Sequence, residues 1–153
     1  MDLSVRIVLR SSSLLFSLLG ITANAPVHKV LPVLRRGSAG RIGIGAAAAD
    51  LFTIFGKNLK VDRKSGTIDA FSASPMLHRR PDLSFQLENG LVTSIKVFSR
   101  RYKTESGVGV GDSLITLANR CQIRWPQDNL AEVETLNMTF RIENDRIVWI
   151  LLS

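Results

Sequence analysis

The chain is short of the side chains on which several protein classes depend. Its 153 residues include one cysteine, Cys121, and two histidines, His28 and His78. A single cysteine excludes an intrachain disulfide, and with it the class of small disulfide-stabilised folds. The histidines lie far apart in the chain, with no cysteine or carboxylate at metal-ligand spacing. We therefore expect no metal site and no cofactor.

Long apolar runs are also scarce. After residue 25 no stretch is apolar for long enough to cross a bilayer as a helix. Residues 1–25 differ, because a basic start is followed by the apolar segment 14–21 and by the small residues Thr22-Ala23-Asn24-Ala25. These are the parts of a secretory signal peptide. The sequence therefore predicts export, to the periplasm or the medium.

The sequence leaves two positions for cleavage of the predicted signal peptide. Pro26 disfavours cleavage after Ala25, because its ring restricts the backbone that a peptidase must bind, so cleavage after Ala23 is the alternative. A further alternative is an uncleaved anchor or an ordinary helix in an intracellular protein. No cysteine lies near either site, so this is not a lipoprotein signal.

Charge is distributed unevenly along the chain, whose net charge is +7. Residues 26–104 carry 14 Lys and Arg against 5 Asp and Glu, whereas residues 105–153 carry 4 against 7. Such a division fits either a solvated surface with a basic and an acidic half or a surface that contacts anions. Aromatic residues do not alternate with the arginines as base stacking would require, so nucleic acid is a disfavoured partner.

The basic residues of the first half gather in pairs. The candidate binding residues are Arg79, Arg80, Arg100, Arg101 and Lys103. The partner that this charge favours is an acidic protein or an anionic component of the cell envelope.

Two sequence patterns occur twice, in the same order. Ile42-Gly43-Ile44-Gly45 corresponds to Val108-Gly109-Val110-Gly111, and the segment 83–90 corresponds to 138–145. An internal repeat constrains architecture more strongly than local propensity does. We predict two copies, at about 38–104 and 105–153. The first copy has the longer middle, and its additional residues are expected in its proline-containing loop.

Each copy is predicted to contain one helix followed by antiparallel strands. In the first copy, helical spacing indicates a helix over 46–55 that ends at Gly56, and turn residues indicate hairpins over 61–70 and 83–98. Asn89-Gly90 is a strong two-residue turn signal in the second of these hairpins.

The second copy follows the same plan with a shorter middle. We expect a helix over 113–121 capped by Asp112, a strand over 122–125 stopped by Pro126, and a strand over 132–143 with a break in alternation near Leu136. The final segment, 147–152, is almost entirely apolar, which predicts a central strand covered on both faces.

These expectations define the fold class. It is α+β, with two helix-plus-antiparallel-hairpin repeats packed into one domain, residues 26–153. One copy alone is too small to bury both its helix face and its sheet face, so the copies are expected to pack together.

Catalytic motifs are weak. Gly111-Asp112-Ser113-Leu114 is similar to the local signature of the GDSL esterases, in which the serine is the nucleophile, but no histidine follows Ser113 to act as its base. The glycines at 107, 109 and 111 lack the spacing and the lysine of a phosphate-binding loop. We expect no catalytic residue and no enzyme activity.

The segments 104–114 and 138–147 together resemble those of small exported bacterial proteins. They are similar to the tandem-repeat α/β proteins of the beta-lactamase-inhibitor and SmpA/OmlA type, and to the RpoE-regulated lipoprotein family of unknown function. This resemblance implies a cell-envelope location and contact with other proteins without catalysis. It transfers no functional residue, and the lipoprotein cysteine and the inhibitors' disulfides are absent.

The sequence as a whole favours an exported, non-enzymatic binding or envelope-associated protein that contacts its partner through the basic first copy. Two alternatives stay open: a small enzyme with a site between the copies, and an intracellular basic protein that binds anions.

Overall fold

The computed structural model describes residues 32–72, 75 and 80–153. The chain divides into the units Met1–Val30 and Leu31–Ser153, and every described residue belongs to the second. The predicted signal peptide, both histidines and Arg79 lie outside the described residues. No helix in the described part has the length and apolar character needed to cross a membrane.

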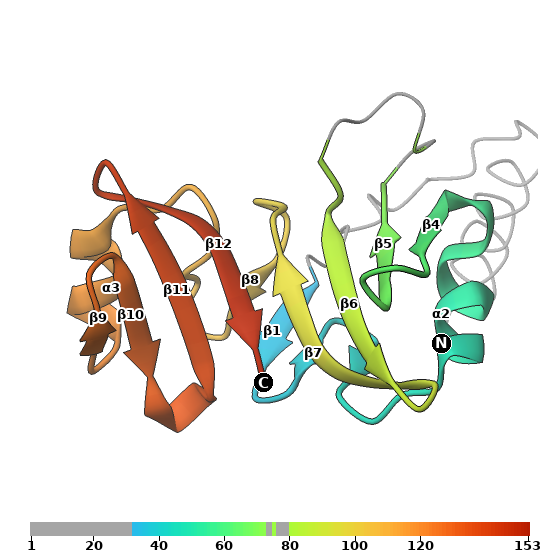
Figure 1. Cartoon of the computed structure of the whole chain (residues 1–153). Coiled ribbons are helices and arrows are strands. Elements are labelled where there is room, and N and C mark those ends of the chain that lie inside the picture. Colours follow the sequence, from blue (N-terminus) through green and yellow to red (C-terminus); the bar gives the residue numbers. More distant parts are fainter. Residues whose placement is uncertain (1–31, 73–74, 76–79) are drawn as a thin grey trace, which may run out of the picture. The chain divides into compact units, whose positions relative to one another are not determined.

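An eight-stranded antiparallel sheet forms the largest part of the fold (Figure 1), in the order β4-β5-β6-β7-β12-β11-β10-β9. Its first four strands in the chain are β4 (Leu59–Asp62), β5 (Thr67–Ala70), β6 (Leu83–Glu88) and β7 (Leu91–Val97). The other four are β9 (Arg124–Gln127), β10 (Leu130–Val133), β11 (Met138–Glu143) and β12 (Arg146–Leu152). Strands β7 and β12 therefore meet at the centre of the sheet.

The two central hairpins are closed by two-residue turns in the left-handed region. Asn89 and Gly90 have φ angles of 52° and 78°, and Asn144 and Asp145 have 49° and 59°. Positive φ at both turn residues matches the twist of the flanking strands, which is why asparagine and glycine occur there. The hairpin predicted over 83–98 is confirmed, as is the shorter one formed by β4 and β5.

A second, smaller sheet has the order β3-β2-β1-β8. Its strands are β1 (Val33–Arg35), β2 (Ser38–Ala39), β3 (Ile42–Gly43) and β8 (Lys103–Thr104). The sheet is mixed, because β8 pairs with β1 in parallel while the other pairs are antiparallel. It ties the start of the described chain to the segment that follows β7.

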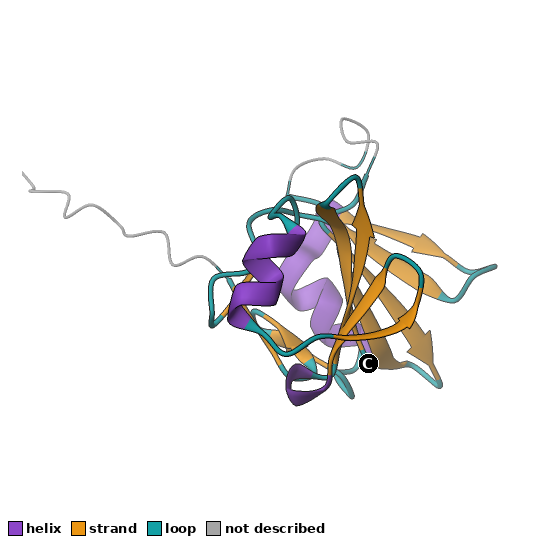
Figure 2. Ribbon diagram, turned by 90° about the vertical axis from the view of Figure 1, so that its left-hand side faces the viewer, coloured by secondary structure: helices purple, strands orange, loops and turns teal. Residues whose placement is uncertain are grey.

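Helices α2 (Ala48–Phe55) and α3 (Leu114–Arg120) lie on the same face of the large sheet (Figure 2). Each has one fully buried side chain, Leu51 on α2 and Leu117 on α3. A short 3₁₀ turn, η1 (Gly56–Asn58), follows α2, and a second, η2 (Glu134–Leu136), lies between β10 and β11. Helices this short are not stable alone, so packing of their leucines against the sheet holds them in place.

The core lies between the helices and one face of the large sheet. Buried residues alternate along the strands, as Leu83 and Phe85 do on β6 and Met138, Phe140 and Ile142 do on β11. Alternation with period two places these side chains on one face of the sheet. Phe85 also contacts Phe55 at the end of α2, with ring centroids 5.9 Å apart.

The predicted α+β class is confirmed, and both predicted helices form with slightly shorter bounds. The predicted helix cap was wrong, however. Ser113 is the N-cap of α3, and its Oγ accepts a hydrogen bond from the Thr116 backbone N–H at 3.2 Å. The Asp112 carboxylate accepts bonds from other groups, which are described below.

Two strand predictions in the second half also need correction. The segment 132–143 forms two strands, and the break in alternation at Leu136 is the η2 turn between them. Pro126 lies inside β9 and does not stop it. Because β9 is an edge strand, one side of its backbone needs no sheet partner, and proline is tolerated there.

The final strand is central as predicted, but it is not buried on both faces. Ile147, Ile150 and Leu152 of β12 are buried, whereas Trp149 and Leu151 stay half-buried on the opposite face. The helices cover one face of the sheet only, so an apolar segment does not by itself imply a doubly covered strand.

The buried leucine of α3 offers a test of this packing. We expect Leu117→Ala to lower the free energy of unfolding by about 2–5 kcal/mol, because it leaves a cavity between helix and sheet. Ile115→Ala is the matched control on the same helix, since Ile115 is 72% exposed, and its effect should stay within about 0.5 kcal/mol. Urea unfolding measures both. Equal losses for the two variants would contradict the packing described.

Candidate functional site

The predicted binding residues do not form one continuous cluster. Arg79 lies outside the described residues. Arg80 lies over the ring of Phe98, with its Cζ 5.7 Å from the ring centroid. Arg101 is exposed on the turn after β7, whereas Lys103 pairs with Asp112 at 2.8 Å. The charge of Lys103 is therefore neutralised within the fold.

A hollow opens where strands β7 and β12 part. The two strands pair only through Ile95–Leu152, Lys96–Leu151 and Val97–Ile150. After Val97 the chain leaves the sheet, and the backbone N–H groups of Phe98 and Ser99 both donate to the Asp82 carbonyl. The first residues of β12 lie beyond the end of β7 and therefore have no β7 residue beside them.

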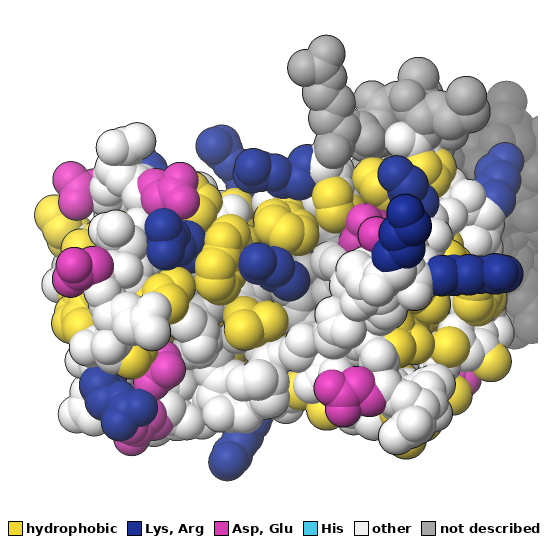
Figure 3. Space-filling model, in the orientation of Figure 1, with side chains coloured by type: hydrophobic (Ala, Val, Ile, Leu, Met, Phe, Trp, Pro, Cys, Tyr) yellow, Lys and Arg dark blue, Asp and Glu magenta, His cyan; other side chains and the backbone are white. Residues whose placement is uncertain are grey.

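The hollow has a volume of about 560 Å³. Three arginines line it, and they are Arg80, Arg100 and Arg146. The rest of the lining consists of the apolar residues Phe98, Val110, Ile147 and Val148, with Gly111. On this face of the molecule, a group of Lys and Arg side chains lies near the middle of the upper edge, with hydrophobic side chains below it and Asp and Glu side chains to its left (Figure 3).

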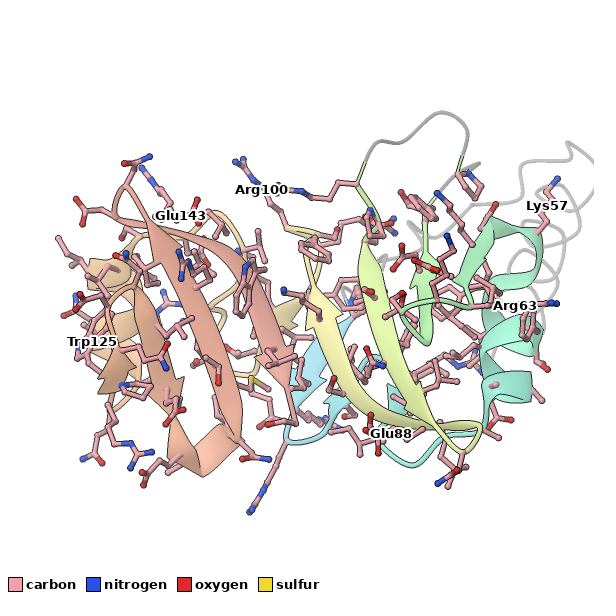
Figure 4. The ribbon with its side chains drawn as sticks, viewed as in Figure 1. Lys57, Arg63, Glu88, Arg100, Trp125 and Glu143 are labelled. Carbon is pink, nitrogen blue, oxygen red and sulfur yellow. The ribbon has the colours of Figure 1, made fainter. Side chains whose placement is uncertain are left out.

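Gly111 brings two of these arginines close to the backbone. Its φ of +89° suits glycine, and a Cβ added there would lie 2.8 Å from Arg100 Nε. The Arg146 guanidinium donates from Nη1 to the Gly111 carbonyl at 3.3 Å. Figure 4 shows that the labelled Arg100 side chain extends past the ends of the central strands into open space.

The arginines of the hollow have no acidic partner within the described part of the chain. The ion pairs found there are Arg35–Glu105, Lys103–Asp112, Arg124–Glu132, Arg124–Glu134 and Arg141–Glu143. None includes an arginine of the hollow, and the described residues that line the hollow include no carboxylate. Three guanidinium groups are thus left to concentrate positive potential in one depression.

Arg146 was missed by sequence reasoning. It belongs to the acidic half of the chain, and it begins β12 directly after the Asn144-Asp145 turn. No motif connects it with Arg80 or Arg100. Only the pairing of β7 with β12 places it beside them, so a charge count along the sequence assigned the basic surface to the first half alone.

Aromatic side chains lie beside the hollow on the uncovered face of the sheet. Lys96 Nζ lies 4.1 Å from the centroid of a Trp149 ring and 5.8 Å from that of Phe98. Phe98 therefore contacts both Lys96 and Arg80. Cation–π contacts of this kind hold long basic side chains in defined positions at a surface.

Asp112 stabilises the wall behind the hollow. Its carboxylate accepts hydrogen bonds from Lys103 Nζ and from the Gly109 N–H, both at 2.8 Å. Partial burial acts to raise the pKa of Asp112, but the bonds from Lys103 and Gly109 and the charges of Lys103 and Arg120 outweigh it, so the pKa is lowered. The carboxylate therefore stays ionised and joins β8 to the loop before α3.

The remaining chemical candidates have structural roles. Ser113 caps α3, and its hydroxyl also lies 2.9 Å from the Thr116 hydroxyl. Cys121 is half-buried at the C-cap of the same helix. Within the described ranges, no three His, Cys, Asp or Glu side chains are grouped as metal ligands.

The ion pair of Asp112 should make the fold sensitive to acid. We expect Asp112→Asn to lower the free energy of unfolding by about 1–2 kcal/mol at pH 7, because Lys103 loses its partner while half-buried. Since folding lowers the pKa of Asp112, its contribution is complete above the ordinary value of 3.8 and is lost as the pH falls below it.

The measurement is urea unfolding of wild type and variant between pH 7 and pH 2. The difference between them should shrink at the acid end. Glu105→Gln breaks the exposed pair with Arg35, in which both side chains are 68% exposed, and should change stability little at any pH. A difference for Asp112→Asn that does not depend on pH would contradict this assignment.

Comparison with known proteins leaves the chain without a match, since no family model, no curated protein and no solved structure matches it. The resemblance to small exported bacterial proteins therefore stays a prediction.

Proposed function

We propose that this chain is an exported, non-enzymatic binding protein that contacts an anionic partner through the surface around its arginine-lined hollow. The predicted contact residues Arg80, Arg100 and Arg101 belong to this surface, and Arg146 joins them. Lys103 supports it from within through Asp112. The partner is an acidic protein or an anionic component of the cell envelope.

The observation that carries this proposal is the group of three arginines that have no acidic partner among the described residues. An arginine that serves only stability usually pairs with a carboxylate or spreads over the surface, whereas these three line one hollow. The other described side chains of the lining are aromatic or aliphatic. Guanidinium, aromatic and aliphatic groups bind ligands, but they do not exchange protons at neutral pH as a general acid or base must.

We further propose that the domain arose as two helix-plus-hairpin repeats. The correspondence seen in the sequence recurs in the backbone hydrogen bonds. The Gly45 N–H donates to Val92, and the Gly111 N–H donates to Ile147, which occupies the place of Val92 in the second pattern. In the same way, the Ala48 N–H donates to Gly90 and the Leu114 N–H donates to Asp145.

The order of strands supports the same proposal. On each side of the β7–β12 pair, the strands follow outward in reverse chain order, ending at β4 on one side and at β9 on the other. The irregularity between Gln86 and Leu87 in the first hairpin corresponds to that between Arg141 and Ile142 in the second. Two equal units joined along one strand pair would produce this order.

The hollow lies at positions where the two proposed repeats have different residues or contacts. The residue that corresponds to Arg146 is Leu91, and Gly45 corresponds to Gly111. A Cβ added at Gly45 would have no heavy atom within 4 Å, whereas one at Gly111 would meet Arg100. The arginine-lined surface therefore depends on residues that differ between the two repeats and not on those that the repeats share.

Two alternatives are distinguished by experiment. A small enzyme with its site between the repeats would need a nucleophile or a proton donor in the hollow, which its described lining lacks. An intracellular anion-binding protein would use the same arginines in another compartment. Location therefore decides between that alternative and the proposal.

The contact surface can be tested by retention of an envelope component. Immobilised full-length protein should retain a component of an envelope fraction at low salt and release it at high salt, because the contacts are between exposed charges. The double variant Arg100→Glu with Arg101→Glu should lose this retention. The matched control is Arg63→Glu with Lys64→Glu, an adjacent basic pair in the β4–β5 turn, which should retain it. Unchanged retention by the first double variant would refute the surface.

Export can be tested by N-terminal sequencing of the native product. We expect the mature chain to begin at Asn24 or Pro26, because cleavage is predicted after Ala23 or Ala25. Fractionation of the same cells should place it outside the cytoplasm. An intact Met1 in a soluble cytoplasmic fraction would overturn the proposed location and favour the intracellular alternative.

A further inference from the structure

The number of positive charges around the hollow restricts the kind of anion that matches it. Arg80, Arg100 and Arg146 line a depression of about 560 Å³, and none of its described lining residues is a carboxylate. A single carboxylate carries one negative charge and matches one guanidinium fork. A phosphate monoester carries close to two charges at neutral pH and three acceptor oxygens, so it can engage several guanidinium groups at once.

All three basic residues are arginines, which also favours an oxyanion. The planar guanidinium presents its donors in a rigid fork that matches phosphate oxygens, whereas lysine acts as a compact point charge. The nearby lysines have other contacts, because Lys103 is bound to Asp112 and Lys96 lies over Trp149. The groups left facing the hollow are thus the ones best suited to bind a phosphate.

The arginines are positioned before any ligand arrives. Arg80 lies over Phe98, Arg146 donates to the Gly111 carbonyl, and Arg100 passes beside the Cα of Gly111. Long side chains that are already restrained lose less conformational entropy on binding than free ones. These contacts are made by two residues, Phe98 and Gly111, which come from different segments of the chain and both line the hollow.

The lining also contains an apolar wall of Val110, Ile147 and Val148. These residues lie in the same hollow as the guanidinium groups. The hollow is larger than a bare phosphate ion needs, so there is room beside the anion for carbon atoms. An organic phosphate, with its oxygens on the arginines and its carbon part against this wall, uses both kinds of lining.

We propose that the hollow between β7 and β12 is a binding site for an organic phosphate monoester, held by Arg80, Arg100 and Arg146. The site rests on the proposed function, since it names the chemistry that the contact surface recognises. The phosphate can belong to a soluble ester or to a lipid headgroup, and the chemistry at the arginines is the same.

The test uses full-length protein and phenyl phosphate as the probe, with benzoate as the matched carboxylate. Isothermal titration at pH 7.5 and low salt should show saturable binding of phenyl phosphate and at least about tenfold weaker binding of benzoate. Arg100→Gln and Arg146→Gln should each weaken phenyl phosphate binding about tenfold, which corresponds to one charge-assisted contact.

The matched control is Arg63→Gln, an exposed arginine beside β4 that Figure 4 shows well away from Arg100. It lowers the net charge equally and should leave binding unchanged. If Arg63→Gln weakens binding as much as Arg100→Gln does, attraction is general and the site is refuted. The site would also be refuted if neither phenyl phosphate nor the vesicles described below showed saturable binding.

A second pair of variants tests the position of Arg100. Gly45→Ala and Gly111→Ala place a Cβ at φ angles of +87° and +89°, so both should lose similar stability from backbone strain. Only Gly111→Ala meets Arg100 and fills part of the hollow. It should weaken phenyl phosphate binding while Gly45→Ala does not, and equal binding by the two would contradict the geometry.

The source of the phosphate is decided with vesicles. Phosphatidylcholine vesicles that contain phosphatidic acid present a monoester, whereas those that contain phosphatidylglycerol present only diesters. Retention on the first and not on the second, lost in the double variant Arg100→Gln with Arg146→Gln, assigns a lipid headgroup. Binding of phenyl phosphate without retention on either assigns a soluble ester.

The outcomes separate this inference from the proposed function. If envelope retention depends on Arg100 and Arg101 but no phosphate probe binds, the phosphate site is wrong and the anionic contact surface stands. If the probe binds through Arg100 and Arg146 but the native product keeps Met1 in the cytoplasm, the phosphate site stands and the exported role is wrong.

Discussion

The pairing of β7 with β12 is the contact on which the rest of the structure depends. Only three residue pairs form it, yet it joins two four-stranded halves into one sheet with Ile95, Val97, Ile150 and Leu152 buried beneath. Because the sheet is continuous, the face under α2 and α3 forms one core. Loss of this pairing would leave two small sheets, each with an exposed edge and too little buried surface for independent stability.

The shortness of that pairing also creates the candidate site. β12 continues past the point where β7 ends at Val97, and the chain after Val97 turns toward β8. The gap is bounded on its other side by Gly111, whose backbone pairs with Ile147. The hollow thus follows from the offset pairing of two strands of seven residues each, and the arginines around it come from segments that the turn and the strand end bring together. The short pairing of β7 with β12 therefore underlies both the fold and the proposed binding surface.

Much of the fold was predictable because its signals are local. The helices, the Asn89-Gly90 hairpin and the alternation of β6 and β11 depend on residues within a few positions of one another. The wrong predictions arose where one local sequence pattern is compatible with two different structures. A break in alternation at Leu136 is a turn in the structure, and the apolar end of the chain is a strand with one covered face. The candidate site was predicted only in part, since Arg80 and Arg100 were named, Arg146 was missed and Lys103 proved to be paired with Asp112.

The sequence by itself determined the two helices, the hairpins β4–β5 and β6–β7, the alternating core positions and the excess of positive charge in the first half. Those properties are set by side-chain chemistry and short-range geometry, so they can be read one segment at a time. Only the tertiary structure decided which charges meet. Arg146 lines the same hollow as Arg80 and Arg100 because antiparallel pairing places the start of β12 beyond the end of β7, beside the segment that follows it, and neither strand carries a local signal for its partner. The pairing of distant strands is chosen by the burial of the whole core, which no single segment contains.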